Sequence, residues 1–206
     1  MGYDYDQTHN RILKSAMEQF IQKGFSGASI REICKNAGVT NGAFYAHFES
    51  KEDMFSALVE PVLKGMQELY NQENLYYMDI KTAADVKKVM KQTFSSNRLI
   101  VHYIFENIDV FKLLLMSGKG TRYEGLIDSL ATEEADNTMK FIDICKPYVS
   151  GGDRISEELV KLTSRFIISS LYDGVISGKS EQEVIHETEL ASEFCLAGMK
   201  HFLGIK

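Results

Sequence analysis

The sequence predicts an all-α protein of about nine helices, and two observations lead to this prediction. Apolar residues recur at helical spacing along almost the whole chain of 206 residues, and strict alternation never persists long enough to predict a strand. The chain holds only 2 prolines, whereas an average usage of about 5% would give roughly 10. The expected architecture is an N-terminal three-helix head with a helix-turn-helix, on a C-terminal helical bundle that dimerises.

The first two helices are predicted by apolar spacing and by their end residues. A first helix is expected over about Asp6 to Lys23, and Gly24 would end it in the left-handed conformation that glycine adopts cheaply. Ser29 and Glu32 have the spacing of a capping box, which predicts the start of a short helix from Ile30 to Ala37.

Two short helices joined by a three-residue turn then predict a helix-turn-helix. Gly38 permits the turn, and Thr40 is the expected cap of a helix from Asn41 to Phe48. Ser50 is the expected N-cap of a fourth helix, which runs to about Gln72. The remaining helices are expected near Thr82–Glu106, Asp109–Ser117, Thr121–Lys146, Ser156–Ser177 and Glu181–Leu203.

Composition and motifs exclude several classes of protein. No stretch approaches the roughly 18 apolar residues of a membrane span, and the acidic, polar N-terminal segment does not resemble a secretory signal. The three cysteines are too widely separated to predict a disulfide framework or a zinc site. The glycine-rich phosphate loop and the common hydrolase motifs are absent from the sequence. We therefore expect a cytoplasmic protein that is not an enzyme and holds no cofactor or metal.

The charge distribution favours DNA binding by the head. Residues 7–51 contain six lysines and arginines and three glutamates, a net charge of +3, which leaves −9 for the rest of the chain. In the third helix Phe44 and Phe48 are expected to face inward. Asn41 would then face outward, with an amide that can pair with adenine in the major groove. Tyr45 and His47 offer donors to backbone phosphates.

The head resembles the DNA-binding domain of the tetracycline-repressor (TetR) family over the first quarter to third of the chain. The resemblance rests on the segments Gly24-Phe25, Ser29-Ile30, Ala37-Gly38-Val39-Thr40, Phe44-Tyr45, His47-Phe48 and Ser50-Lys51-Glu52. It implies a homodimeric, ligand-responsive transcription factor, usually a repressor, that binds double-stranded operator DNA. The DNA contacts that it implies are Ser29, Arg31, Thr40, Asn41, Gly42, Ala43, Tyr45, His47 and Lys51.

Asn41 and Ala43 depart from the family pattern. Many relatives carry a lysine or arginine at the position of Asn41, and a larger residue is common at the position of Ala43. The predicted division is a DNA-binding domain at residues 7–67 and a ligand-binding and dimerisation domain at residues 68–206. A helical protein-interaction module and a helical enzyme without DNA binding are the alternatives.

The C-terminal part predicts a dimer and a ligand site. The helix Ser156–Ser177 is apolar almost all round, so it needs cover on every side. A chain of this length offers too few partners, which favours a homodimer through the last two helices over a well-buried helix in a monomer. A small, largely apolar effector is expected near aromatic and methionine side chains, which are otherwise core residues. The candidates are Met66, Tyr70, Tyr103, Met116, Tyr123 and Phe166.

Overall fold

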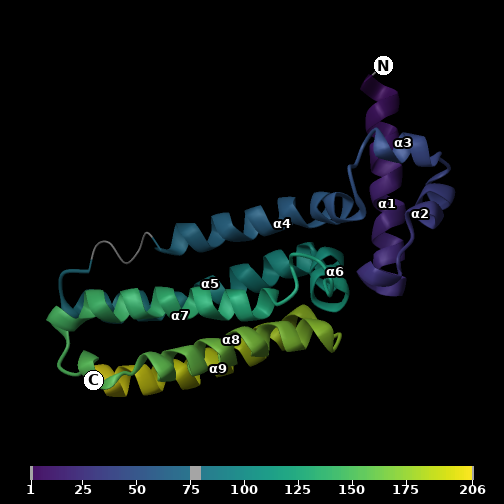
Figure 1. Ribbon diagram of the computed structural model, residues 1–206. Coiled ribbons are helices and arrows are strands. Elements are labelled where there is room, and N and C mark those ends of the chain that lie inside the picture. Colours follow the sequence, from purple (N-terminus) through teal and green to yellow (C-terminus); the bar gives the residue numbers. More distant parts are fainter. Residues whose placement is uncertain (1, 75–79, 206) are drawn as a thin grey trace. The chain divides into compact units, whose positions relative to one another are not determined.

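The computed structural model describes residues 2–74 and 80–205, and over these residues the chain is helical, without a β-strand. The all-α prediction is confirmed (Figure 1). The helices are α1 (Gly2–Gly27), α2 (Ile30–Ala37), α3 (Asn41–Tyr45), α4 (Lys51–Asn74), α5 (Ala83–Glu106), α6 (Ile108–Ser117), α7 (Leu126–Cys145), α8 (Glu157–Ile176) and α9 (Glu181–Leu203), with short 3-10 turns at η2 (Lys146–Tyr148) and η3 (Gly152–Arg154).

The chain packs into two units that are not contiguous in sequence. The N-terminal unit consists of Met1–Gly65 and Asn107–Glu124, and the C-terminal unit consists of Met66–Glu106 and Gly125–Lys206. Helix α4 passes from one unit to the other. This division differs from the predicted one, because α6 and the loop after it belong to the N-terminal unit.

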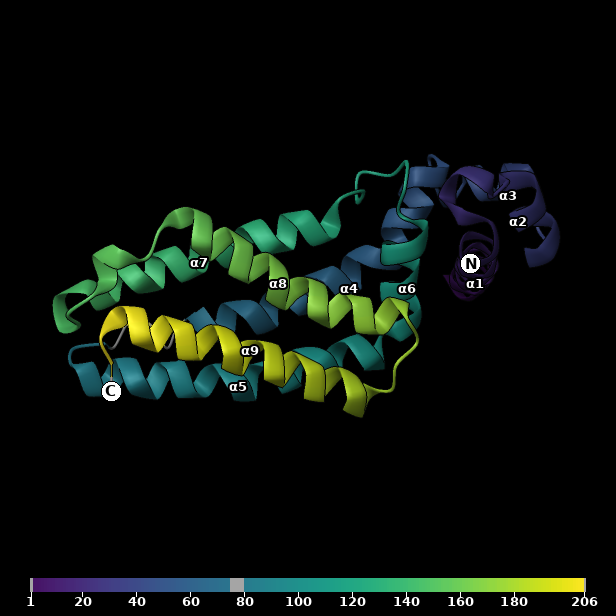
Figure 2. The same cartoon turned by 90° about the horizontal axis from the view of Figure 1, so that it is seen from below.

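In the N-terminal unit, α1 is the central helix. Its side chains Ile12, Ala16 and Phe20 are fully buried, and α1 contacts both α2 and α6 (Figure 2). Gly24 interrupts the helix with φ 69° and ψ 168°, so the positive φ expected there is present. The regular helix therefore ends at Gly24 as predicted, and a short second helical segment follows the kink and runs to Gly27.

The predicted capping box at the start of α2 is wrong. Ser29 has extended backbone angles, and its side chain makes no cap hydrogen bond. The carboxylate of Glu32 instead pairs with Lys23 across the gap to α1, which lowers the pKa of Glu32. A capping box does form at the start of α9, between Ser180 and Glu183, where the sequence analysis did not expect one.

Two helix ends also differ from prediction. Helix α3 ends at Tyr45, not at Phe48, because the chain tightens into i→i−3 hydrogen bonds from the backbone N–H groups of residues 46 and 47. Helix α7 begins at Leu126, not at Thr121, because Gly125 takes φ 81° immediately before it.

In the C-terminal unit, α5, α7, α8 and α9 lie side by side in both ribbon views (Figures 1 and 2). One core cluster joins α5, α7 and α9 through Val86, Met90, Phe141 and Leu203. Helices α8 and α9 approach closely at Gly174, where a Cβ atom would lie 2.8 Å from Cγ2 of Val184. No helix in the described ranges has the length and apolar character that crossing a membrane requires.

A row of polar contacts joins α5 to α9. Arg98 pairs with Glu189, and Nδ2 of Asn97 donates to Oγ of Ser192 at 2.8 Å. Nδ1 of His102 lies 3.0 Å from Oε1 of Glu181, at the start of α9. This hydrogen bond, together with the charge of Glu106, raises the pKa of His102 above its ordinary value.

The raised pKa predicts a pH-dependent contribution of His102 to stability. The contribution is fully present below the unfolded pKa of about 6.5 and is lost as the pH rises through the higher folded pKa. We therefore expect His102→Gln to lower the melting temperature at pH 5.5 and to leave it nearly unchanged at pH 8.5. His186→Gln, at an exposed position on α9, is the control. A loss equal at both pH values would contradict the prediction.

Candidate nucleic-acid interface

Helix α3 presents its first turn to solvent while its apolar side stays in the core. The side chain of Phe44 is fully buried, whereas Tyr45 is 61% exposed. Thr40 caps the helix as predicted, because its Oγ1 accepts a hydrogen bond of 3.1 Å from the N–H of Ala43. Asn41 and Gly42 are exposed. A small residue, an amide and a phenol therefore share an open surface, which suits the approach to base edges and phosphates.

Arg11 and Gly38 hold the turn between α2 and α3. Gly38 has φ 65° and ψ 38°, the left-handed conformation that glycine adopts without steric cost. Nε of Arg11 donates to the carbonyl of Ala37 at 2.9 Å, and Nη2 donates to the carbonyl of Gly38 at 2.9 Å. A Cβ atom on Gly38 would lie 2.8 Å from Nη2. This role of Arg11 was not predicted from the sequence, in which the residue counts only as a positive charge.

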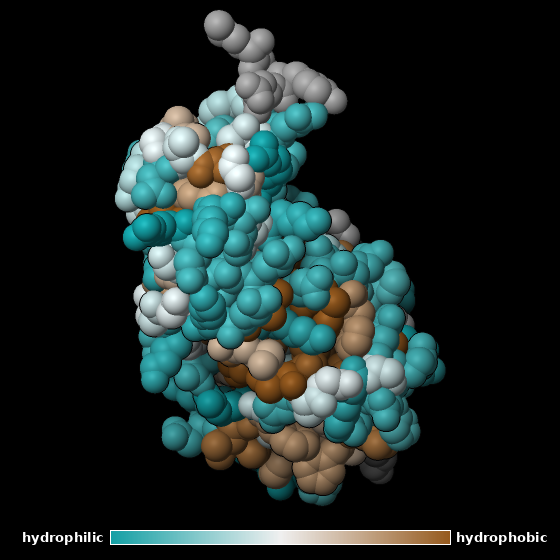
Figure 3. All heavy atoms as spheres, turned by 90° about the vertical axis from the view of Figure 1, so that its right-hand side faces the viewer, coloured by the Kyte–Doolittle hydropathy of each residue, from teal (hydrophilic) through white to brown (hydrophobic). Residues whose placement is uncertain are grey.

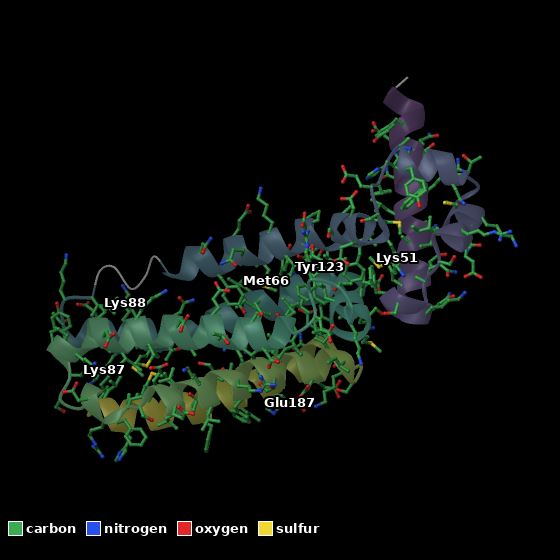
Figure 4. The ribbon with its side chains drawn as sticks, in the orientation of Figure 1. Lys51, Met66, Lys87, Lys88, Tyr123 and Glu187 are labelled. Carbon is green, nitrogen blue, oxygen red and sulfur yellow. The ribbon has the colours of Figure 1, made fainter. Side chains whose placement is uncertain are left out.

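Lys51 ties the start of α4 to the end of α1 (Figure 4). Its Nζ donates to the carbonyl of Phe25 at 2.6 Å and to that of Ala28 at 3.0 Å, and it lies 4.5 Å from the centre of the Phe25 ring. Burial lowers the pKa of Lys51. Two of the three N–H donors of the ammonium group are therefore used inside the head, and a phosphate contact has the third to use.

His47 lies just after α3 in a cluster of rings from two elements. Its ring centre is 4.0 Å from that of Tyr5 and 5.5 Å from that of His9, both on α1. The Nδ1 atoms of His9 and His47 are buried without a hydrogen-bond partner. Burial, and secondarily the charge of His9, lowers the pKa of His47.

The predicted DNA-contact residues fall into two groups by exposure. The exposed ones are Ser29, Arg31, Thr40, Asn41, Gly42 and Tyr45. The half-buried ones are Ala43, His47 and Lys51. The surface around α3 also includes Tyr5 and His9, which the sequence analysis did not select. The sequence feature that could have indicated Tyr5 and His9 is their spacing of four residues on the first helix, which places both rings on one face.

The predicted ligand residues are divided between the two units. Met66, Tyr70, Tyr103 and Phe166 belong to the C-terminal unit, and Met116 and Tyr123 to the N-terminal unit. Met66 is buried, whereas Met116 is 64% exposed.

Tyr123 has a structural role in the N-terminal unit. Its hydroxyl donates to Oε1 of Glu60 at 3.1 Å, and its ring centre lies 5.8 Å from that of Phe55 (Figure 4).

An open hollow in the C-terminal unit includes one of the predicted ligand residues, Tyr70. The other lining residues are Leu130, Glu133, Glu134 and Asn137. In the described part of the chain, no three histidine, cysteine, aspartate or glutamate side chains gather as a metal site.

A helix-turn-helix with an exposed second helix is the arrangement with which many transcriptional regulators bind DNA. Residues 12–58 match the sequence model of the family described as bacterial regulatory proteins, tetR family. Over these residues the chain resembles the TetR family of transcriptional regulators.

Relatives extend this finding. The chain is 48% identical over 54 residues to the HTH-type transcriptional regulator AcrR of Shigella flexneri, which covers 26% of this chain and 25% of that protein. It is 30% identical over 112 residues to the HTH-type transcriptional regulator UidR of Escherichia coli K12, covering 52% of this chain and 56% of UidR. The chain thus spans from a quarter to about half of these relatives' lengths.

The fold is shared more widely than the sequence. The TetR-family regulator PfmR of Thermus thermophilus superposes with a TM-score of 0.60 at 20% identity, over 90% of this chain and 94% of PfmR. The helical body as well as the head therefore has the fold of this family.

The contacts of Lys51 predict a stabilising role in the head. Lys51→Met keeps an apolar stem over Phe25 but removes two hydrogen bonds from a charged donor. We expect the free energy of unfolding to fall by about 1–3 kcal/mol, measured by urea denaturation with far-UV circular dichroism. Lys35→Met, at an exposed position on α2, should change it by less than about 0.5 kcal/mol. Equal stability of both variants would contradict the structural role.

Proposed function

We propose that the protein is a ligand-responsive repressor that binds a palindromic operator as a homodimer and is released by a small-molecule effector. The observation that carries the proposal is the exposed face of α3, with Asn41 and Gly42 open to solvent and Phe44 fully buried beneath them. An α-helix presented in this way enters the major groove in helix-turn-helix proteins.

Within this proposal, the exposed residues have different tasks. Asn41 reads a base edge, because its amide can donate and accept at once. Thr40, Tyr45 and His47 contact phosphates, which fix the register of the head on DNA. Ser29 and Arg31, at the exposed start of α2, contact the backbone beside them. Gly42 and Ala43 are small enough to permit close approach, and Lys51 adds a charge.

Exposed apolar side chains on the last two helices support the homodimer. Leu162 and Phe166 on α8 are 65% and 49% exposed, and Leu190 and Phe194 on α9 are 53% and 75% exposed. The rings of Phe166 and Phe194 contact each other, with centres 6.4 Å apart. On the face drawn in Figure 3, apolar surface lies open between polar side chains. Apolar surface of this kind marks sites of association.

The chain connections support coupling between an effector and the head. Helix α6 belongs to the N-terminal unit, yet α5 before it and α7 after it belong to the C-terminal unit. Oγ of Ser117 donates to the carbonyl of Phe20 at 2.9 Å, and the N–H of Arg122 donates to Oε1 of Glu52 at 2.9 Å. An effector that shifts α5 or α7 therefore pulls on contacts to α1 and α4, and the bound and free states differ in affinity for DNA.

Selection of duplexes from a random-sequence pool tests the function, and Asn41→Ala tests the docking. We expect the wild type to select a palindrome with two half-sites about one helical turn apart. Asn41→Ala should cost roughly 1–3 kcal/mol per half-site and relax the preference at one symmetric pair of positions. Gln22→Ala, an exposed amide on α1, is the control. Selection of no duplex would overturn the function, and an unchanged preference would overturn the docking.

The dimer predicts a specific effect of a charge on α9. Phe194→Glu places a carboxylate where the proposed interface is apolar, and it should convert a dimer at micromolar concentration into a monomer in sedimentation experiments. Leu99→Glu changes a side chain that is 58% exposed on α5 and should leave the dimer intact. A wild-type monomer, or a dimer that tolerates Phe194→Glu, would contradict the interface.

A further inference from the structure

The first turns of α1 cover a residue just after α3, which is the recognition helix of the proposed function. Tyr5 and His9 lie four residues apart on α1, with ring centres separated by 6.3 Å. The ring of His47 lies 4.0 Å from Tyr5 and 5.5 Å from His9, and His9 stacks on Phe48 at 4.7 Å. The hydroxyl of Tyr5 donates to the carbonyl of Ala46 at 3.4 Å. Ring contacts therefore cover the His47 side chain from the α1 side, and the hydrogen bond ties Tyr5 to the backbone of the preceding residue, Ala46.

The buried Nδ1 of His47 determines which nitrogen can meet DNA. A neutral imidazole has one N–H donor and one acceptor nitrogen. Nδ1 is buried without a partner, and burying an N–H donor in this state costs more than burying a lone pair. The favoured tautomer therefore carries its proton on Nε2, and the buried Nδ1 is closed to an external phosphate.

A second proton on His47 is disfavoured by its surroundings. It would place a donor at the buried Nδ1, and burial together with the charge of His9 opposes it by lowering the pKa of His47. The titratable neighbours on α1 are Tyr5, Asp6 and His9, and Tyr45 and Glu49 flank His47 in sequence. Among these, His9 is the group whose charge lowers the pKa of His47.

We propose that Tyr5 is a positioning residue that holds His47 as an uncharged Nε2–H donor to a DNA phosphate. The inference rests on the proposed DNA-binding function and deepens it. The first turns of α1 become part of the DNA-gripping surface, although Tyr5 itself acts through His47. His47 then binds this phosphate through a neutral hydrogen bond and not through a charge. This contact therefore releases no counterion from the DNA.

A double-mutant cycle tests whether Tyr5 acts through His47. The probes are the duplex that the wild type selects from the random pool and a duplex of mixed sequence. Tyr5→Ala should weaken binding to both by about tenfold at pH 8, because a phosphate contact carries no sequence information. Tyr5→Phe keeps the ring and should restore most of the affinity. In a His47→Ala background, Tyr5→Ala should have no further effect. Gln7→Ala, in the same turn, is the matched control.

A side-chain NMR titration tests the protonation state without DNA. In Tyr5→Ala the His47 ring becomes exposed, so its titration midpoint should rise towards the ordinary value of about 6.5. His9→Gln should raise the midpoint as well, by removing the like charge. Binding by Tyr5→Ala should then recover partly at pH 6, with a salt slope steeper by about 1 per subunit than at pH 8.

The outcomes separate this inference from the proposed function. Additive losses in the cycle, an unchanged His47 midpoint in both variants, or wild-type affinity in Tyr5→Ala would overturn the role of Tyr5 and leave DNA binding intact. Selection of no duplex by the wild type would overturn the DNA-binding function, and the positioning role with it, whatever the titration shows. Circular dichroism establishes that each variant keeps its helices.

Discussion

The orientation of the recognition helix depends on one guanidinium group. The last carbonyls of α2 have no partner within that helix, and Arg11 of α1 donates to two of them, at Ala37 and Gly38. Gly38 permits these hydrogen bonds for two reasons. It adopts a positive φ, and it has no Cβ atom that would collide with Nη2 of Arg11. The backbone that leads into α3 is therefore held against α1, the central helix of the head. The positions of the exposed side chains of α3 depend on these hydrogen bonds of Arg11.

Half of the lysine and arginine side chains in residues 7–51 make contacts inside the head, although its net positive charge suggests that they face DNA. Of the six lysines and arginines in residues 7–51, Arg11 and Lys51 donate to backbone carbonyls and Lys23 pairs with Glu32. Positive charge near the C-terminal end of a helix stabilises that end, so these residues organise the head from within, and of the three only Lys51 is also proposed to contact DNA. In the proposed function, recognition then relies mainly on neutral donors and on fit, which favours discrimination between sequences over non-specific binding to DNA.

The sequence predicted what depends on near neighbours in the chain. Apolar spacing predicted the presence of each α-helix in the described part of the chain, and Thr40 caps α3 as expected, because both signals lie within a few residues. Contacts between distant segments were not predictable in this way. Lys51 had the character of a phosphate ligand, and only the packed head brings the Phe25 and Ala28 carbonyls to it. For the same reason Glu32 forms an ion pair with Lys23 and not a capping box with Ser29. Tyr123 packs in the N-terminal unit, although its position in the sequence predicted the C-terminal domain.

The insertion of α6 into the N-terminal unit has a consequence for biosynthesis. A ribosome releases the chain from its N-terminus, so α1 to α3 emerge long before Ser117 can bond to Phe20 or Tyr123 can pack on Phe55. The head completes its packing only after residue 124 has left the exit tunnel, by which time α5 has already emerged. A nascent chain that stalls earlier exposes the side of α1 that α6 would cover. The packing of the head is therefore completed late in translation, after much of the C-terminal unit has been synthesised.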